Sequence, residues 1–343
     1  MGVNLRDLVP KTTPKLSSLG GKSIAVDAYN ALYQFLAIIR QPDGTPLKDQ
    51  TGRVTSHLSG ILYRTANLVE MTIKPVYVFD GTPPALKEVE IKRRTRIKEA
   101  AAIKYEKALK AGKVEEAHTY AQATSRLKDY MTEDSKRLLD YIGIPWIQAP
   151  SEGEAQAAHL ARKGATNFCA SQDYDSLLFG APFLIRNLTL SGKRKLPGKK
   201  VYVEVVPEIV SLNQVLKELS LTHKQLVDIG ILIGTDYNPD GIKGIGPKTA
   251  LKLVKTHGSL EKIPNLEEGD FPVPPNRIRQ IFLEPKVTDN YKLKWRRPND
   301  EEVVDFLCNE RDFSENRVKR ALEKIDYGLR ELREKTTIEQ FFG

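Results

Sequence analysis

Three short apolar runs mark the centre of the predicted fold. Residues 24–26 and 76–79 each lead directly into an aspartate, and a third run lies within residues 167–171. Runs of this length are typical of strands buried on both faces of a parallel sheet. Apolar positions at helical spacing predict helices at about 28–39 and 56–71. The alternation predicts an α/β fold with a mostly parallel central sheet flanked by helices.

The pattern changes between residues 83 and 134. This stretch is rich in Lys, Arg, Ala and Glu and nearly lacks β-branched apolar runs. It predicts a helical insertion above the carboxyl edge of the sheet, with basic residues concentrated between positions 87 and 98. A solvated helix with internal charge pairs is the alternative explanation of the same basic cluster.

The last third of the chain has a helical pattern. Between about residues 212 and 260, helical spacing lies on both sides of a glycine-rich turn at 241–248. A final helix is expected at about 315–334, followed by a short tail at 335–343. We expect residues 1–343 to form a single domain, although this length also allows two.

The composition narrows the class of protein only moderately. There are 53 Lys and Arg against 44 Asp and Glu, a net charge of +9, which favours a polyanionic partner without excluding acidic proteins or membrane surfaces. Two cysteines are too few for a disulfide framework or a zinc site. With no apolar run of membrane-spanning length and no signal-peptide pattern, we expect a soluble intracellular protein with no membrane partner.

Seven acidic residues stand where a predicted element ends or turns. Each alone has a structural explanation, because acids often cap a helix or lie in its first turn, and Ser151 with Glu154 has the spacing of a capping box. In a parallel sheet, however, the carboxyl ends of the strands meet at one edge, where ligands bind. The seven are Asp27, Asp80, Glu152, Glu154, Asp173, Asp175 and Asp236.

Carboxylates gathered at one edge repel one another and would be costly without a cation. Asp173 and Asp175 are two positions apart and can share one side of an extended chain. Oxygen ligands select Mg²⁺ or Mn²⁺, and no Cys/His cluster competes for zinc. Two such ions, about 3.5–4 Å apart, fit an in-line displacement at phosphorus.

The glycine-rich turn has the form of a helix-hairpin-helix. Its glycines allow close approach of a backbone, and the following helix offers free N–H groups to a phosphate. Such a motif contacts the nucleic-acid backbone, so it gives affinity without base specificity. A glycine-rich helix connector is the alternative. The residues concerned are Gly241, Lys243, Gly244, Gly246 and Lys248.

Taken together, these motifs resemble the flap endonuclease family of 5′ structure-specific nucleases over essentially the full chain. The residues that show the resemblance lie at 26–28, 77–84, 149–157, 171–175, 234–238 and 241–250. The resemblance implies a PIN-like nuclease core in which residues 83–134 form the family's arch, through which the free 5′ strand passes. The seven acids match the family's metal ligands, which implies two Mg²⁺ ions, with Mn²⁺ able to substitute.

Further site residues follow from the same resemblance. Lys87 and Arg94 match basic residues of the arch that contact the scissile phosphate, and Tyr33 matches an aromatic that stacks on a nucleobase. Gly2 matches a glycine near the bent DNA junction, which implies removal of Met1. The family's hairpin also holds a monovalent cation, usually K⁺, through backbone oxygens.

The tail resembles the family's box for binding the sliding clamp, PCNA. Ile338, Phe341 and Phe342 would form the apolar plug, while Lys335 stands where the family has glutamine, which puts clamp affinity in doubt. A frayed apolar terminus is the alternative. The absence of a basic extension after Gly343 favours an archaeal protein, cytoplasmic and nucleoid-associated; a eukaryotic one would be nuclear. We expect a monomer.

The resemblance predicts a 5′ flap endonuclease with 5′–3′ exonuclease activity that acts on branched DNA in Okazaki-fragment maturation and repair. A related 5′ exonuclease or bubble-cutting DNA repair nuclease is the nearest alternative. An RNA-cutting nuclease with a PIN-like sheet would not need the arch and the hairpin together. A clamp-tethered junction-binding protein without activity would require that the acids bind no metal.

Overall fold

The structure is a computed structural model that describes residues 2–41, 43–124, 126–190, 192–195 and 202–342. For some residues within helices and strands, including 335–342, the backbone alone is described. No helix in these ranges is long and apolar enough to cross a membrane.

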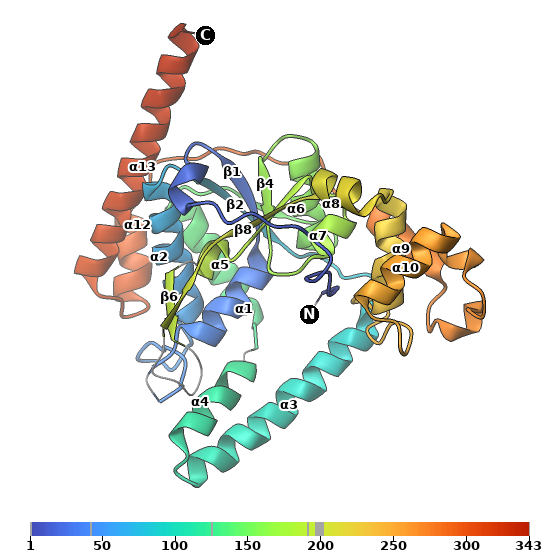
Figure 1. Cartoon of the computed structure of the whole chain (residues 1–343). Helices are drawn as coiled ribbons and strands as arrows, with labels where there is room; N and C mark the ends of the chain where they lie inside the picture. Colours follow the sequence, from blue (N-terminus) through green and yellow to red (C-terminus); the bar gives the residue numbers. More distant parts are fainter. Residues whose placement is uncertain (1, 42, 125, 191, 196–201, 343) are drawn as a thin grey trace.

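A six-stranded sheet lies at the centre of the molecule (Figure 1). Its strand order is β3-β2-β1-β4-β5-β8, in which the first five are parallel and β8 is antiparallel to β5. The strands are β1 (Ser23–Asp27), β2 (Lys74–Phe79), β3 (Trp146–Gln148), β4 (Phe168–Ala170), β5 (Phe183–Arg186) and β8 (Glu208–Ser211). The mostly parallel α/β sheet predicted from the sequence is confirmed.

Both faces of the sheet are buried, which explains why its strands are continuous apolar runs. Ile24 and Val26 point into one core cluster, whereas Ala25 between them points into the other. Tyr77 and Val78 alternate in the same way on β2. Successive side chains of a strand face opposite sides, so each strand contributes to both cores. Full burial of one such side chain stabilises the fold by about 1.5–3 kcal/mol.

Two sets of helices cover these faces. One face packs against α1 (Ala28–Ile38), α2 (Ser56–Glu70), α5 (Asp129–Tyr141), α12 (Asp300–Val304) and α13 (Glu315–Phe342). The other packs against α6 (Gly153–Arg162), α7 (Asp175–Leu178), α8 (Leu212–Leu219), α9 (His223–Ile233), α10 (Pro247–His257) and α11 (Pro275–Leu283). Shorter elements are the 3₁₀ turns η1 (Leu16–Leu19), η3 (Leu188–Leu190), η4 (Leu260–Lys262) and η5 (Glu268–Asp270), the π-helical turn Asp305–Asn309, and the antiparallel pair β6 (Gly192–Lys195) and β7 (Tyr202–Val205).

The insertion between β2 and β3 stands away from the body. It begins with η2 (Ala85–Lys87), continues as the long helix α3 (Glu88–Lys110), and returns as α4 (Val114–Ala123) (Figure 1). The boundary expected at residue 134 falls within α5, which packs against α2 in the body. The described helices that leave the body therefore end at Ala123.

The last helix is longer than the sequence predicted. We expected it to end near residue 334, but the backbone of α13 remains helical to Phe342 and projects beyond the body (Figure 1). Neither Gly nor Pro occurs between Leu329 and Phe342, so no residue interrupts helix propagation. The side chains of Ile338, Phe341 and Phe342 lie outside the described residues, and clamp binding stays a prediction.

Gly328 lies where α13 crosses the end of α2. A Cβ at this position would stand 1.8 Å from the carbonyl oxygen of Val69. We predict that Gly328→Ala lowers the free energy of unfolding by about 1–3 kcal/mol, because the two helices must separate to admit the methyl group. Gly269→Ala is the matched control, since its added Cβ meets nothing within 4 Å. Equal unfolding midpoints for the two variants would contradict this packing.

Candidate active site

The seven predicted acids converge at the carboxyl edge of the sheet. Asp27 ends β1 and Asp80 follows β2, whereas Asp173 lies after β4. The charges of Asp80 and Asp173 both act on Asp27, and those of Glu152 and Asp236 act on Asp80. Glu154 is in turn within electrostatic range of Asp175, Asp173 and Asp27. The acids therefore form one cluster, which we call the acid cluster.

Burial and mutual repulsion disfavour the ionised forms of these carboxyls. Burial, followed by the charge of Asp80, raises the pKa of Asp27 to about 8. Burial also raises the pKa of Asp80 to about 6 and, together with the charges of Asp236 and Asp173, that of Asp175 to about 7. The pKa of Glu154 is raised well above its usual value by burial and then by Asp175. This environment favours any cation that can replace the protons.

Backbone amides orient three of the acids. The N–H groups of Asn30, Gly153 and Val3 donate to Asp27 Oδ1, Asp80 Oδ1 and Asp175 Oδ1 at 2.9, 2.5 and 2.6 Å. Asp27 thus does cap α1, as its structural explanation predicts, while it also belongs to the acid cluster. One carboxylate serves both roles because it has two oxygens.

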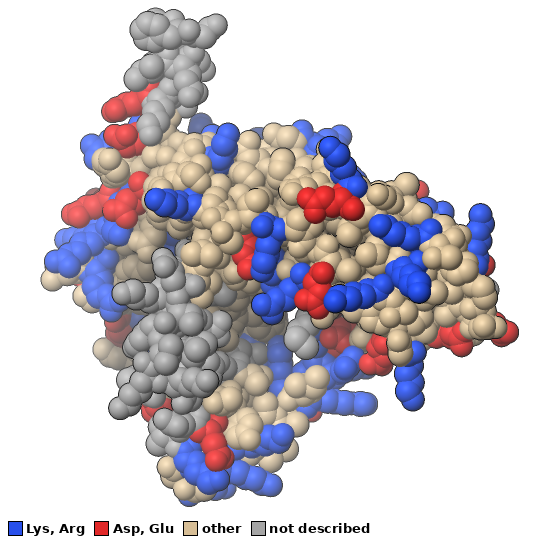
Figure 2. Space-filling model, in the orientation of Figure 1, with Lys and Arg blue, Asp and Glu red and all other residues tan. Residues whose placement is uncertain are grey.

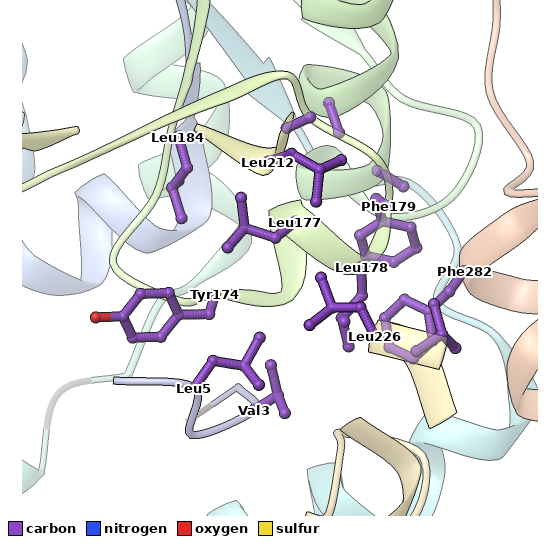
Figure 3. Close-up of a cluster of buried hydrophobic side chains, with 14 of the residues drawn as sticks. Val3, Leu5, Tyr174, Leu177, Leu178, Phe179, Leu184, Leu212, Leu226 and Phe282 are labelled. Atoms are coloured by element: carbon purple, nitrogen blue, oxygen red, sulfur yellow. The ribbon is translucent and has the colours of Figure 1, made fainter. Parts of the chain in front are cut away.

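Asp173 is held by the N-terminal segment and by α1. The nitrogen of Gly2 lies 3.1 Å from its Oδ1, and Asn30 Nδ2 donates to its Oδ2 at 3.2 Å. Val3 and Leu5 anchor the segment in an apolar cluster beside Tyr174 (Figure 3). A Cβ on Gly2 would lie 2.7 Å from Asp175 Oδ2, so a larger residue would disturb the acids.

Two expectations about local geometry are wrong. Ser151 does not cap α6, because its hydroxyl donates to the carbonyl of Thr82 and Glu154 instead accepts from the N–H and hydroxyl of Ser176. Asp173 and Asp175 do not share an extended segment, since the chain bends between them and Asp175 begins α7. Both side chains still reach the acid cluster.

Two basic side chains of the insertion that runs from η2 to α4, which we call the arch from here on, enter the acid cluster. The Lys87 ammonium contacts Glu152 Oε1 and lies 3.1 Å from Asp236 Oδ2, while Arg94 forms an ion pair with Asp236 and donates to Glu90 at 2.8 Å. Burial alone would lower the pKa of Lys87, but Glu152 and Asp236 outweigh it and raise that pKa. Lys87 therefore supplies part of the positive charge that the acids require.

Tyr33 lies on α1, where its ring faces Lys98 of the arch. Its side chain is partly exposed, and the ammonium of Lys98 on α3 stands 4.2 Å from the ring centroid. A base that stacks on this face would have to displace Lys98, a cation that itself attracts phosphate.

Within the described residues, no three His, Cys, Asp or Glu side chains already stand in the geometry of a metal site. The acids nevertheless suit a divalent ion by their chemistry, because they are buried, oxygen-only and electrostatically coupled. Lys87 between Glu152 and Asp236 shows that a cation fits among them. An ion bound at this place would displace the Lys87 ammonium from Glu152 and Asp236.

Comparison with known proteins finds similar chains of one family. The XPG N-terminal domain matches residues 1–101, and the XPG I-region matches residues 143–236. Flap endonuclease 1 of Staphylothermus marinus is 55% identical over 336 residues, which cover 96% of each chain. That of Caldivirga maquilingensis is 56% identical over 350 residues, covering 100% of both. The solved structure of flap endonuclease-1 from Methanococcus jannaschii has a TM-score of 0.75 and 44% identity, and covers 94% of this chain and 98% of that one.

The chain belongs to the flap endonuclease family. It is therefore a metal-dependent DNA nuclease that cleaves flap structures, and the resemblance identified from the sequence is confirmed. The PIN-like core is confirmed by the same comparisons.

The predicted hairpin lies in the connection between α9 and α10, which also carries Asp236 of the acid cluster. Gly241 and Gly244 have positive φ angles of 53° and 84°, which favour glycine. Ile242 N–H donates to the carbonyl of Leu232 at 2.8 Å and closes the turn. Gly246 precedes α10 without a side-chain cap, and Lys243 and Lys248 are exposed on either side. The first turn of α10 thus presents N–H groups beside two cations.

Several residues that contact the acids were not predicted from the sequence. Asn30 reaches Asp173, Ser176 reaches Glu154, and Tyr237 reaches Glu152. Two of them directly follow a predicted acid in the chain, and Asn30 lies one helical turn after Asp27. Proximity to an acid was the available signal, but it does not reveal which acid each residue contacts.

Proposed function

We propose that the acid cluster holds two Mg²⁺ ions, for which Mn²⁺ can substitute, and that the enzyme hydrolyses a phosphodiester where a 5′ flap meets duplex DNA. The convergence of seven carboxylates at one sheet edge, each buried or partly buried, is the observation that supports this most strongly. When bound, the ions stabilise charge at phosphorus and lower the pKa of the attacking water. The residues that would hold them are Asp27, Asp80, Glu152, Glu154, Asp173, Asp175 and Asp236.

Lys87 and Arg94 would act on the phosphate. Both come from the arch, and both now contact acids that divalent ions would neutralise. Once those acids are neutralised, the ammonium and guanidinium groups can turn to the phosphate and stabilise the negative charge that develops there. Tyr33 would stack on a base displaced beside the scissile bond after Lys98 has moved aside.

The arch and the hairpin would bind different parts of the substrate. The arch extends away from the body (Figure 1), Lys87 and Arg94 at its base contact the acid cluster, and it would admit a strand with a free 5′ end. Lys and Arg side chains are spread over the arch and over the part of the body built from α8–α10 (Figure 2). Gly241, Gly244 and Gly246 would approach the duplex backbone, flanked by Lys243 and Lys248, with K⁺ held by backbone oxygens. Gly2 lies beside Asp173, where the bent junction would pass.

Further parts of the proposal concern partners and setting. The C-terminal tail would bind PCNA through Ile338, Phe341 and Phe342, and the enzyme would act as a monomer tethered to the clamp. It would serve in Okazaki-fragment maturation and DNA repair in the archaeal cytoplasm, associated with the nucleoid. The helical backbone of α13, which extends away from the body, supports a tail that a partner can reach (Figure 1).

Stability should depend on pH and Mg²⁺ together. The raised pKa values of Asp27, Asp175 and Asp80 (about 8, 7 and 6) mean that the native state binds more protons than the unfolded state between roughly pH 4 and 8. The metal-free protein should therefore lose stability as pH rises through that window. Because ions bind deprotonated carboxylates, the gain in melting temperature from EDTA to Mg²⁺ should be larger at pH 8 than at pH 5.

Calorimetry with EDTA and with Mg²⁺ at each pH measures the two gains in melting temperature. Titrating groups that do not contact the ions affect both members of each pair equally, so their contribution cancels. In Asp27→Asn the difference between the two gains should shrink, because one titrating carboxyl is gone. A gain in melting temperature from Mg²⁺ that is equal at both pH values, or larger at pH 5, would contradict the proposed ion site.

A labelled double-flap DNA tests the activity itself. In Mg²⁺ we expect one main cut near the junction, leaving a 5′-phosphate and a 3′-hydroxyl, and no cut in EDTA. A bulky block on the 5′ end should suppress cutting, because the strand could no longer pass the arch. Efficient cutting of a bubble or of a blocked flap would favour the bubble-cutting alternative, and release of mononucleotides alone would favour the exonuclease.

A further inference from the structure

Both oxygens of Glu152 are occupied by specific partners. Lys87 contacts Oε1, and the hydroxyl of Tyr237 donates to Oε2. Tyr237 is 3% exposed and directly follows Asp236 in the loop after α9. A buried tyrosine hydroxyl needs an acceptor, and here the acceptor is a member of the acid cluster.

The ring of Tyr237 has little freedom to move. It packs edge-on against Phe282 of α11 with ring centroids 5.3 Å apart, and Phe282 in turn lies 4.8 Å from Phe179. Figure 3 shows Phe179 and Phe282 side by side in the apolar cluster. These contacts place the phenol at a defined point beside Glu152.

The backbone of the same loop is equally constrained. Asn238 Oδ1 accepts from the N–H and hydroxyl of Thr235 at 3.2 and 2.7 Å, and Asn238 Nδ2 donates to the carbonyl of Ile231 at 2.7 Å. Tyr237 is therefore fixed from its backbone to its ring. A rigid donor on one oxygen of a carboxylate determines how that carboxylate is rotated.

We propose that Tyr237 is a positioning residue that fixes the rotation of Glu152, so that Oε1 faces the ion site while Oε2 is held by the phenol. The inference rests on the proposed role of Glu152 as a metal ligand. Hydrogen bonds to a ligand's second atom commonly determine metal affinity in this way. Because Phe282 belongs to α11, which packs on α9 beside the hairpin, the same contact ties Glu152 to the part of the enzyme that would bind duplex.

The test measures Mn²⁺ binding to the full chain without DNA, by titration calorimetry and electron paramagnetic resonance. Tyr237→Phe removes the hydroxyl and keeps the ring. We expect the dissociation constant for Mn²⁺ to rise about 10- to 100-fold, the usual effect of removing a residue that hydrogen-bonds a metal ligand. Tyr77→Phe is the matched control, because it also removes a buried tyrosine hydroxyl, one that pairs with Thr65 at 2.9 Å. It should bind Mn²⁺ like the wild type.

A double-mutant cycle with Glu152→Gln tests whether Tyr237 acts through Glu152. The double variant should bind Mn²⁺ no more weakly than Glu152→Gln alone. Mn²⁺ affinity within twofold of wild type in Tyr237→Phe, or fully additive losses, would overturn the proposal. So would a fall in melting temperature beyond that of Tyr77→Phe with unchanged Mn²⁺ affinity, which marks a purely structural hydroxyl. Absence of saturable Mn²⁺ binding in the wild type would instead overturn the proposed ion site, and this inference with it.

Discussion

Replacing Asp173 with Asn should reduce cleavage of a 5′-flap substrate by about 10³-fold or more, because bound ions supply several kcal/mol of the catalysis and each 1.4 kcal/mol is tenfold. Asp173 stands within electrostatic range of Asp27, Glu154 and Asp175, so it is central to the acid cluster. Asn keeps the shape and the acceptor for Gly2 but removes the charge. Cleavage should be followed in Mg²⁺ under single-turnover conditions.

Binding of the flap substrate should survive this change within a few fold. It is measured by fluorescence anisotropy in Ca²⁺, and the proposed contacts to duplex lie on the hairpin. Asp300→Asn makes the same chemical change at an exposed position at the start of α12 and should cut like the wild type. Retained cleavage in Asp173→Asn would rule out the acid cluster as the catalytic centre.

Lys87→Met should slow the chemical step by about 10²–10³-fold, the usual effect of removing one preorganised charge donor. Lys87 is the arch cation that contacts both Glu152 and Asp236, so it is held where phosphate oxygens would meet the ions. Methionine keeps the length and the apolar stem. The single-turnover rate at saturating enzyme reports the chemical step, and a separate titration reports affinity.

Lys92→Met is the matched control in the same insertion, on the helix α3 that begins directly after Lys87. Lys92 pairs at 3.3 Å with Glu88, and both side chains are strongly exposed, so this pair contributes little. The control should lose at most a few fold in affinity and nothing in single-turnover rate. Equal rate losses in the two variants, or lost binding with a normal chemical step in Lys87→Met, would show that Lys87 acts only through general attraction to DNA.

The structure also indicates how the protein tolerates so many buried acids. Three factors reduce the repulsion between them: protonation, hydrogen bonds from backbone N–H groups, and ion pairs with the arch cations. The raised pKa of Asp27 and the contacts of Lys87 and Arg94 are examples. Burying uncompensated charge is costly, and removing one partner of a buried pair is more so. Ion binding would therefore free the arch cations as well as fill the site.

Much of the fold followed from apolar runs and their period. The runs at 24–26 and 76–79 are strands because parallel sheets are covered on both faces, and the chain places an acid at each of their ends. The end of the last helix was missed because its final residues carry tail-like chemistry but no residue that breaks a helix. A helix ends where residues such as Gly or Pro interrupt it, whereas a binding motif can be either helical or extended.

The candidate site was also predictable only in part. That acids at strand ends would meet is a property of parallel topology, and the sequence predicted it for Asp27 and Asp80. The partners of each acid could not be predicted, because Lys87 reaches Glu152 and Asp173 reaches Gly2 only after distant segments have packed. Ser151 shows the converse, since its spacing fits a cap, in which the side-chain oxygen would accept from a backbone N–H, but its hydroxyl instead donates to the carbonyl of Thr82.

Crystals grown with Mn²⁺ and measured at the manganese absorption edge test the central claim most directly. The anomalous difference map should show two peaks among the seven acids, with Lys87 turned away from Glu152 and Asp236. A map without peaks there, with Lys87 still bound to both carboxylates, would contradict the claim that this acid cluster exists to hold divalent ions.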